Sequence, residues 1–176
     1  DLHSFPTRRS SDLTANGLIK PSFYAYSLLA QLGCSVIKKG KDFLVTRNND
    51  AIQILFHNQR NLNDFNDEEE LTPEEYYKRM MNKQKFKKIN LNIRNMEGHY
   101  RVIRYELNYE SCCIYYRWIL QRCPQFLIDR DIKILNKQTV PRVSFDSIND
   151  KEVNFSLSLP PDGLELIILE KDIYNN

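Results

Sequence analysis

The chain has 176 residues, enough for one medium domain or for a small domain with an additional segment. Hydrophobic residues make up 41% and charged residues 27%, with a net charge of +2, which supports a globular core and excludes the strong global field typical of nucleic-acid-binding proteins. No apolar run approaches the roughly 20 residues that a membrane-spanning helix needs.

Residues 1–13 (DLHSFPTRRSSDL) show neither a helical nor a strand period. No apolar stretch long enough for a signal peptide follows the Arg8–Arg9 pair. A flexible arm or pro-peptide is one interpretation. The string also resembles the translated read-through of a sequencing adapter, so we treat it as an artefactual or disordered leader outside the fold.

Residues 17–33 (GLIKPSFYAYSLLAQLG) carry the most regular helix signal in the chain. Pro21 suits the first helical turn, and Gly33 stands where a left-handed residue would end the helix. The apolar residues Ala25, Leu28, Leu29 and Leu32, widened by Phe23 and Tyr26, are spaced for one buried stripe. Two interpretations follow: a core helix of this domain, or the last helix of a preceding domain.

After this helix the apolar period shifts towards two, which predicts strands. Residues 41–46 (KDFLVT) and 51–57 (AIQILFH) flank the polar turn 47–50 and form a predicted hairpin, with 34–38 as a possible third strand beside it. Residues 61–70 (NLNDFNDEEE) read as an acidic loop.

A second helix is predicted from Thr72 to about residue 82, where Thr72, Pro73 and Glu75 form a capping box with proline at the first helical position. The basic run 83–88 (KQKFKK) follows it. A phosphate-binding patch is one interpretation, but a solvated linker that balances the acidic loop is favoured, because no aromatic platform is interleaved.

Strict alternation predicts strands at 86–93 (FKKINLNI) and 100–108 (YRVIRYELN), joined through a turn as an antiparallel hairpin. A helical period returns at 111–122 (SCCIYYRWILQR) and is ended by Pro124, and a further short helix is predicted at 126–135. The last three predicted strands are 142–145, 152–159 and 164–169, with a sharp Pro-Pro-Asp-Gly turn at 160–163 between the final two. This pattern of antiparallel strands favours a β-sandwich with two short helical insertions.

The four cysteines, Cys34, Cys112, Cys113 and Cys123, lack the spacing of a zinc site, so reduced buried thiols are the favoured interpretation. His3, His57 and His99 have no ligand or triad partner at a recognisable spacing. Trp118 suits a sugar-stacking platform in principle, but its place beside Tyr115 and Tyr116 in a helical pattern favours packing. No pair of opposed carboxylates is evident, and no catalytic, cofactor-binding or metal-ligating residue is predicted.

Three segments together resemble one enzyme family. Residues 17–33 resemble the closing barrel helix of glycoside hydrolase family 39, the β-xylosidase group, where a KPSFYAF-like helix precedes a C-terminal β-sandwich. The strand 100–108 resembles that family's Y-x-I-x-x-Y-x-[IL]-[ND] strand, which a segment leading to a Trp follows. Residues 159–169 (LPPDGLELIIL) resemble its final hairpin. Cys113 and Ile114 depart from the pattern, which has a Tyr or Asp there.

The resemblance implies a mainly β fold, an antiparallel β-sandwich preceded by one amphipathic helix left over from a (β/α)8 barrel. It implies a leader at 1–13, the terminal barrel helix at 14–33, and a β-sandwich accessory domain at 34–174 with helical insertions near 72–83 and 111–135. The two catalytic Glu residues of such a retaining β-xylosidase would lie upstream of residue 14. The predicted function is therefore a non-catalytic fragment that is inactive by itself.

The alternative function is a free-standing carbohydrate-binding or interaction module. Tyr100 and Tyr105 argue mildly against an aromatic platform, because residues an odd number apart face opposite sides of a strand. We expect the catalytic barrel of the same chain as the main partner, or a second copy through the sandwich or the 17–33 helix. No nucleic-acid, membrane or cofactor partner is expected. A cytoplasmic location is the expectation, and any native signal peptide would lie upstream of residue 14.

Overall fold

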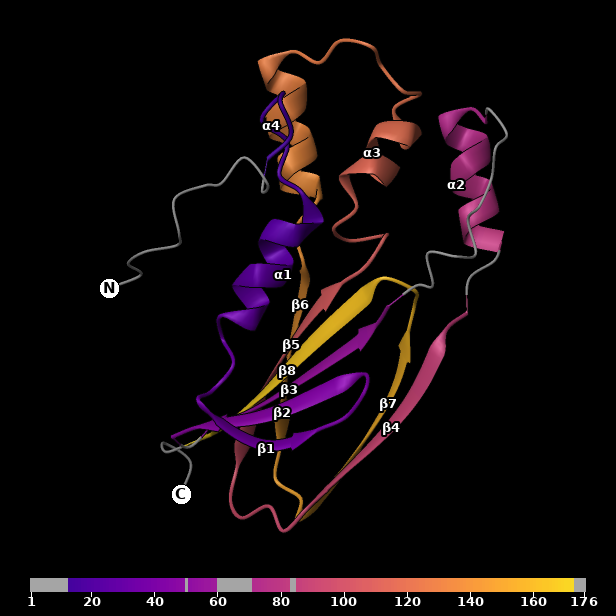
Figure 1. The fold of residues 1–176 in the computed structure, drawn as a ribbon. Helices are drawn as coiled ribbons and strands as arrows, with labels where there is room; N and C mark the ends of the chain where they lie inside the picture. The colour runs from indigo at the N-terminus through magenta and orange to yellow at the C-terminus, as the bar shows by residue number, and fades with distance from the viewer. Residues whose placement is uncertain (1–12, 50, 60–70, 83–84, 173–176) are drawn as a thin grey trace.

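The computed structural model describes residues 13–49, 51–59, 71–82 and 85–172, which form mainly antiparallel β-structure with short helices (Figure 1). The helices are α1 (Pro21–Leu29), α2 (Pro73–Asn82), α3 (Ile114–Leu120) and α4 (Asp129–Gln138). The strands are β1 (Ser35–Lys39), β2 (Phe43–Asn48), β3 (Ala51–Asn58), β4 (Lys87–Arg94), β5 (Tyr100–Leu107), β6 (Arg142–Ile148), β7 (Glu152–Leu159) and β8 (Gly163–Lys171). The predicted fold class is confirmed. The leader up to residue 12 and the acidic loop lie outside the described residues.

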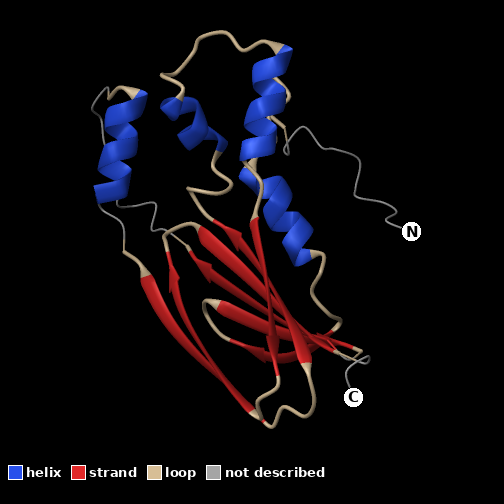
Figure 2. Cartoon of the chain, turned by 180° about the vertical axis from the view of Figure 1, so that it is seen from behind, coloured by secondary structure: helices blue, strands red, loops and turns tan. Residues whose placement is uncertain are grey.

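The strands form two sheets. One has six strands in the order β1-β2-β3-β8-β5-β6, and the other pairs β4 with β7. Every pairing is antiparallel. Figure 2 shows the strands gathered in one part of the molecule, with α2, α3 and α4 beyond one end of the sheets and α1 against the larger sheet. None of the described helices is long and apolar enough to cross a bilayer.

The larger sheet is apolar on both faces, because alternate side chains of its central strands point to opposite sides. One face packs against the β4–β7 sheet, and its buried core consists of Ile54, Phe56, Met96, Val102, Leu157, Leu159, Ile167 and Leu169. The opposite face packs against α1, with Leu28, Leu55, Ile103, Leu107, Cys112, Leu166 and Ile168 buried there. Tyr100 joins the first core and Tyr105 the second, which confirms that they face opposite sides.

Helix α1 begins at Pro21, as predicted, and ends at Leu29. Leu28 is 2% exposed against the sheet, whereas Tyr26 is 64% and Leu29 40% exposed, so the predicted stripe is wrong at these two positions. The prediction for Gly33 is also wrong. Gly33 has no positive φ, and the constraint on it is steric, because a Cβ there would lie 2.3 Å from the Arg47 carbonyl oxygen. The buried stripe is narrower than predicted because only one side of the helix, with Leu28 and Ala25, packs against the sheet.

The predicted hairpin between strands 86–93 and 100–108 is wrong. The first of these strands, β4, pairs with β7, and the second, β5, lies between β8 and β6. The physical reason is burial. Strand β4 is apolar on one face only and suits a small outer sheet, whereas β5 buries Val102 on one side and Ile103 on the other and suits the centre of a large sheet.

The final hairpin is wrong for the same reason. The Pro160–Gly163 turn forms, with the Gly163 amide donating to the Pro160 carbonyl oxygen at 3.0 Å, but it carries the chain from one sheet to the other. Asn58 joins the sheets nearby, because its side-chain amide donates to Leu159 O at 3.0 Å. The hairpin of β2 and β3, with β1 beside it, is confirmed.

Polar side chains cap the starts of α2 and α4, two of the helices at the end of the sheets. Glu75 accepts the Thr72 amide at 2.9 Å, and Thr72 Oγ1 accepts the Glu75 amide at 3.3 Å, so the predicted capping box of α2 is confirmed. Helix α4 starts three residues later than predicted, because the Asp131 carboxylate accepts the Ile128 amide at 3.2 Å. Leu18, Ile114 and Leu135 form a third, small core in this helical layer.

Candidate functional site

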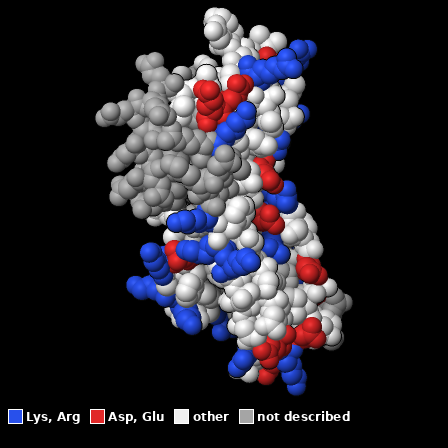
Figure 3. Space-filling model, turned by 90° about the vertical axis from the view of Figure 1, so that its right-hand side faces the viewer, with Lys and Arg blue, Asp and Glu red and all other residues white. Residues whose placement is uncertain are grey.

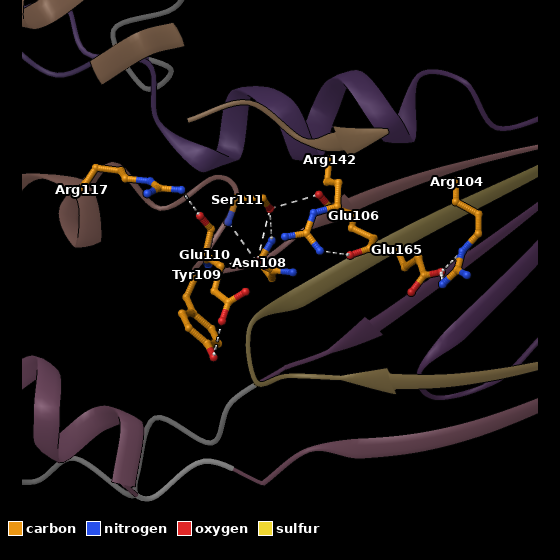
Figure 4. Close-up of polar contacts among 9 residues, drawn as sticks. All are labelled: Arg104, Glu106, Asn108, Tyr109, Glu110, Ser111, Arg117, Arg142 and Glu165. Carbon is orange, nitrogen blue, oxygen red and sulfur yellow. Dashed lines mark hydrogen bonds and ion pairs between the residues drawn. The ribbon is translucent and has the colours of Figure 1, made fainter. Parts of the chain in front are cut away.

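Four charged side chains meet on the inner face of the larger sheet, near the end that adjoins the helices. Arg104 and Glu106 lie two residues apart on β5 and so share a face. Glu106 has a partner on each neighbouring strand. Glu165 on β8 lies directly opposite it on one side, and Arg142 on β6 lies directly opposite it on the other. Figure 4 shows these residues across the three neighbouring strands.

Glu165 is the buried member of this charge cluster, with 5% exposure. Its Oε1 accepts hydrogen bonds from Arg104 Nε at 2.9 Å and from Nη2 at 2.6 Å. Burial raises the pKa of the Glu165 carboxyl, the Arg104 guanidinium opposes this rise, and the Glu106 carboxylate adds to it. The second pair is looser, because Arg142 Nη1 lies 3.7 Å from Glu106 Oε2.

The turn after β5 is built from side-chain hydrogen bonds. Asn108 Oδ1 accepts the backbone amides of Glu110 at 2.9 Å and Ser111 at 3.0 Å. The Ser111 hydroxyl donates to the Glu106 carbonyl oxygen at 3.1 Å. Arg117 on α3 donates to the Glu110 carbonyl oxygen at 2.7 Å (Figure 4). These bonds fix the junction between the larger sheet and α3.

Tyrosines connect this turn to α2. The ring of Tyr77 stacks on Tyr116 with centroids 4.9 Å apart, and Tyr109 meets Tyr116 edge-on at 6.2 Å. Burial, and secondarily Tyr116, raises the pKa of Tyr77. The Tyr77 hydroxyl has no hydrogen-bond partner within the described part of the chain. The cluster therefore anchors α2 to α3 through aromatic packing.

Trp118 is half-buried in the helical layer. Its indole nitrogen donates to the Pro124 carbonyl oxygen at 3.0 Å, and its ring tilts against Tyr115 with centroids 5.7 Å apart. It also lines a largely apolar cavity of about 530 Å³ with Leu18 and Leu127. The predicted packing role fits these contacts.

The other residues singled out from the sequence lie apart from one another. His57 is half-buried beside Asn58 and Asp162, and His99 precedes β5, where its carbonyl oxygen accepts the Asp172 amide at 2.8 Å. All four cysteines are free thiols. Cys112 is fully buried, and burial raises the pKa of its thiol to about 12, so it stays protonated. Cys34 is exposed, against the prediction of burial.

The basic run ends on the outer sheet. Figure 3 shows this side of the molecule, with basic side chains over its middle and acidic ones interspersed. Lys87 forms a 2.6 Å ion pair with Asp42, and this hydrogen bond holds the pKa of Asp42 below its usual range. Residues 83 and 84 lie outside the described residues. Within the described part of the run, Lys87 thus links the start of β4 to the segment before β2.

The two carboxylates of the charge cluster differ from the catalytic pair of a glycosidase in their arrangement and in their partners. A retaining glycosidase places two carboxyl groups about 5–5.5 Å apart on either side of the scissile bond. Glu106 and Glu165 are side by side on one sheet, and each is engaged by an arginine. Because Glu165 is only 5% exposed, a sugar ring cannot lie against it. The cluster braces the strands and the turn that leads to α3.

One signal of this charge cluster is present in the sequence, and the sequence-based prediction missed it. Glu165 interrupts the otherwise apolar strand 164–169, and a charge inside a buried strand is kept only with a partner. The identity of the partner depends on the register between β5 and β8, which are far apart in the sequence.

No protein-family model and no curated protein matches the sequence. Solved structures match the fold. A glycoside hydrolase family 39 (GH39) enzyme from Xanthomonas axonopodis pv. citri aligns with a TM-score of 0.66 and 15% identity over 89% of this chain and 31% of its own. This chain has the fold of a part of GH39 enzymes. The likeness that the sequence suggested is confirmed at the level of the fold.

Two further GH39-fold neighbours agree. A monomeric β-xylosidase from Caulobacter crescentus CB15 aligns with a TM-score of 0.65 and 17% identity over 90% of this chain and 32% of its own. A bacterial orthologue of human α-L-iduronidase aligns with a TM-score of 0.62 and 14% identity over 96% of this chain and 30% of its own. The chain thus spans about three-tenths of the length of these proteins.

Proposed function

We propose that the chain is a non-catalytic β-sandwich accessory domain of a glycosidase resembling the GH39 β-xylosidases. The observation that carries the proposal is the share of each chain that the structural alignments cover. About nine-tenths of this chain aligns with about one-third or less of three glycosidase chains. In the parent enzyme a separate catalytic barrel would hydrolyse O-glycosidic bonds, with xylo-oligosaccharides as the substrate class.

The role of the domain is to brace that barrel. Helix α1 lies on one face of the larger sheet and turns Tyr26 and Leu29 to the outside. Exposed apolar side chains of this size are typical of surfaces that contact another protein body. The barrel of the same chain is the proposed partner for this side of α1, with a second copy of the chain as the alternative.

The test is a hydrolase assay on the purified full chain with a nitrophenyl β-xyloside. We expect no release of nitrophenol above the buffer rate, because the buried Glu165 and its neighbour Glu106 are both bound to arginines. A rate that survives repurification and falls in a Glu106→Gln variant would overturn the proposal.

The reading frame upstream of residue 14 supplies an independent test. We expect it to encode the strands and helices of a barrel with two glutamates at strand ends. A frame that encodes an unrelated domain would also overturn the proposal.

A further inference from the structure

A pocket lined by polar and apolar groups in similar proportion opens at the C-terminal end of α1, on the helix-bearing face of the larger sheet and away from the charge cluster (lower end of α1 in Figure 1). Its volume is about 740 Å³, within the range of roughly 300–1,000 Å³ that small-molecule sites occupy. Its walls come from the segment that follows α1, from the turn between β2 and β3, and from the ends of β5 and β8.

Gln53 is the fixed donor of this pocket. The side chain is 4% exposed, and its Oε1 accepts the Gly33 amide at 3.2 Å and the Thr46 hydroxyl at 3.0 Å. The backbone amide of Gly33 can only donate, so the oxygen end of the Gln53 amide must face it. Gln53 is among the residues that line the pocket, and these bonds hold its side chain in one orientation. The N–H groups of its Nε2 are therefore the donors that it can offer a ligand.

The charged groups that line the pocket balance one another among the described residues. Arg101 donates through Nε to Glu170 Oε2 at 3.1 Å and forms a second, shorter contact through Nη2. Lys171 and Asp172 add one charge of each sign to the lining. A charged ligand therefore gains little from this site. Arg101 keeps unused N–H donors, and Glu170 keeps Oε1 as an acceptor.

The rest of the lining offers donors and acceptors together. The amide side chains of Asn48 and Asn49 supply both kinds of group. Leu32, Ile168 and two alanines supply the apolar part of the lining, which is about as large as the polar part. A neutral ligand whose hydroxyl groups both donate and accept matches this arrangement.

We propose that this pocket binds a neutral, polyhydroxylated ligand, a short oligosaccharide, with the Gln53 amide, Arg101 and Asn48 as its hydrogen-bonding contacts. The inference of a neutral polyhydroxylated ligand rests on the lining of the pocket, and only the choice of xylotriose as the probe rests on the proposed function. No aromatic side chain lines the pocket among the described residues, so we expect hydrogen bonding without stacking and a dissociation constant on the order of 1 mM.

The test is a titration of the 15N-labelled full chain with xylotriose, followed by NMR. We expect saturable shifts in the side-chain signals of Gln53 and Asn48 and in the Arg101 Nε–H signal. Arg101→Met and Asn48→Ala alter exposed side chains and should each weaken binding about fivefold or more. Gln53→Met should abolish binding, with the dispersion of its spectrum showing whether it is folded.

The matched controls are Arg94→Met and Asn90→Ala, which change exposed residues on the outer sheet and should leave the affinity unchanged. The proposal is overturned if these signals do not move at xylotriose concentrations on the order of 10 mM. It is equally overturned if Arg101→Met and Asn48→Ala bind as the unmodified chain does, or if trialanine saturates the same signals and xylotriose does not.

Discussion

Glu165 and Arg104 form an ion pair whose two side chains differ in burial. The Glu165 side chain is 6% exposed, whereas the Arg104 side chain is 31% exposed. Removing the arginine leaves a buried carboxylate without its counter-charge. We expect Arg104→Met to lower the free energy of unfolding by about 2 kcal/mol in chemical denaturation at neutral pH. The added change Glu165→Gln should restore most of that loss.

The control for this pair is Arg94→Met, which removes an ion pair whose side chains are 73% and 49% exposed. Pairs of this kind contribute little, so the change should stay within about 0.5 kcal/mol. Equal losses of unfolding free energy in the Arg104 and Arg94 variants would show that the Glu165–Arg104 pair stabilises the chain no more than an exposed ion pair does.

The same carboxyl group gives stability a pH dependence. Because burial raises the pKa of Glu165 in the folded chain, the folded state binds this proton more tightly than the unfolded state. The stabilisation that the Glu165 carboxyl contributes is therefore present below its ordinary pKa of about 4.5. It is lost as the pH rises through the raised pKa of the folded chain. We expect the difference in unfolding free energy between the unmodified chain and Glu165→Gln to fall across that interval. A flat difference would contradict the raised pKa.

At the scale of elements, Gly33 governs how α1 is joined to the larger sheet. Its amide lies 2.9 Å from Thr46 Oγ1 and 3.2 Å from Gln53 Oε1, and a Cβ would lie 2.3 Å from the Arg47 carbonyl oxygen. We expect Gly33→Ala to lower the free energy of unfolding by about 2 to 3 kcal/mol, because the backbones must separate and weaken these bonds. Thermal or chemical denaturation measures this.

Gly17 provides the comparison. It has a φ of +77° with open space around it, so Gly17→Ala suffers backbone strain without a clash and should cost about 1 kcal/mol. A smaller loss for Gly33→Ala than for Gly17→Ala would show that the contact with β2 relaxes easily and that the steric explanation is wrong.

At the scale of the whole molecule, the larger sheet ends at β1 and β6, and neither strand pairs with a further strand among the described residues. On β6, Phe145 is 69% exposed beside an unpaired strand edge, which is a template for pairing with another copy. We expect the purified chain to associate at micromolar concentration in sedimentation velocity runs, and Phe145→Lys to raise the dissociation constant about tenfold.

Phe126→Lys is the control, since Phe126 is 87% exposed but lies outside the strands. It should leave the association unchanged. If Leu29→Glu on α1 abolishes association and Phe145→Lys does not, the contact runs through the helix and the expected edge pairing is wrong.

The sequence by itself determined the local structure. Pro21 and the Thr72–Glu75 capping box placed two helix starts, and the alternation in the β2–β3 region placed a hairpin, because each signal acts over a few residues. The likeness to GH39 enzymes was also visible in short segments, and the structure confirms it for the fold.

Only the tertiary structure decided which strands pair. β4 and β5 are neighbours in sequence, yet they lie in different sheets, because burial on one face or on both decides where a strand belongs. The charge cluster and the pocket depend on that choice, since Glu165 meets Glu106 and Gln53 comes near Arg101 only through the position of β8 between β3 and β5. Register between distant strands is set by the packing of whole faces, which no local pattern contains.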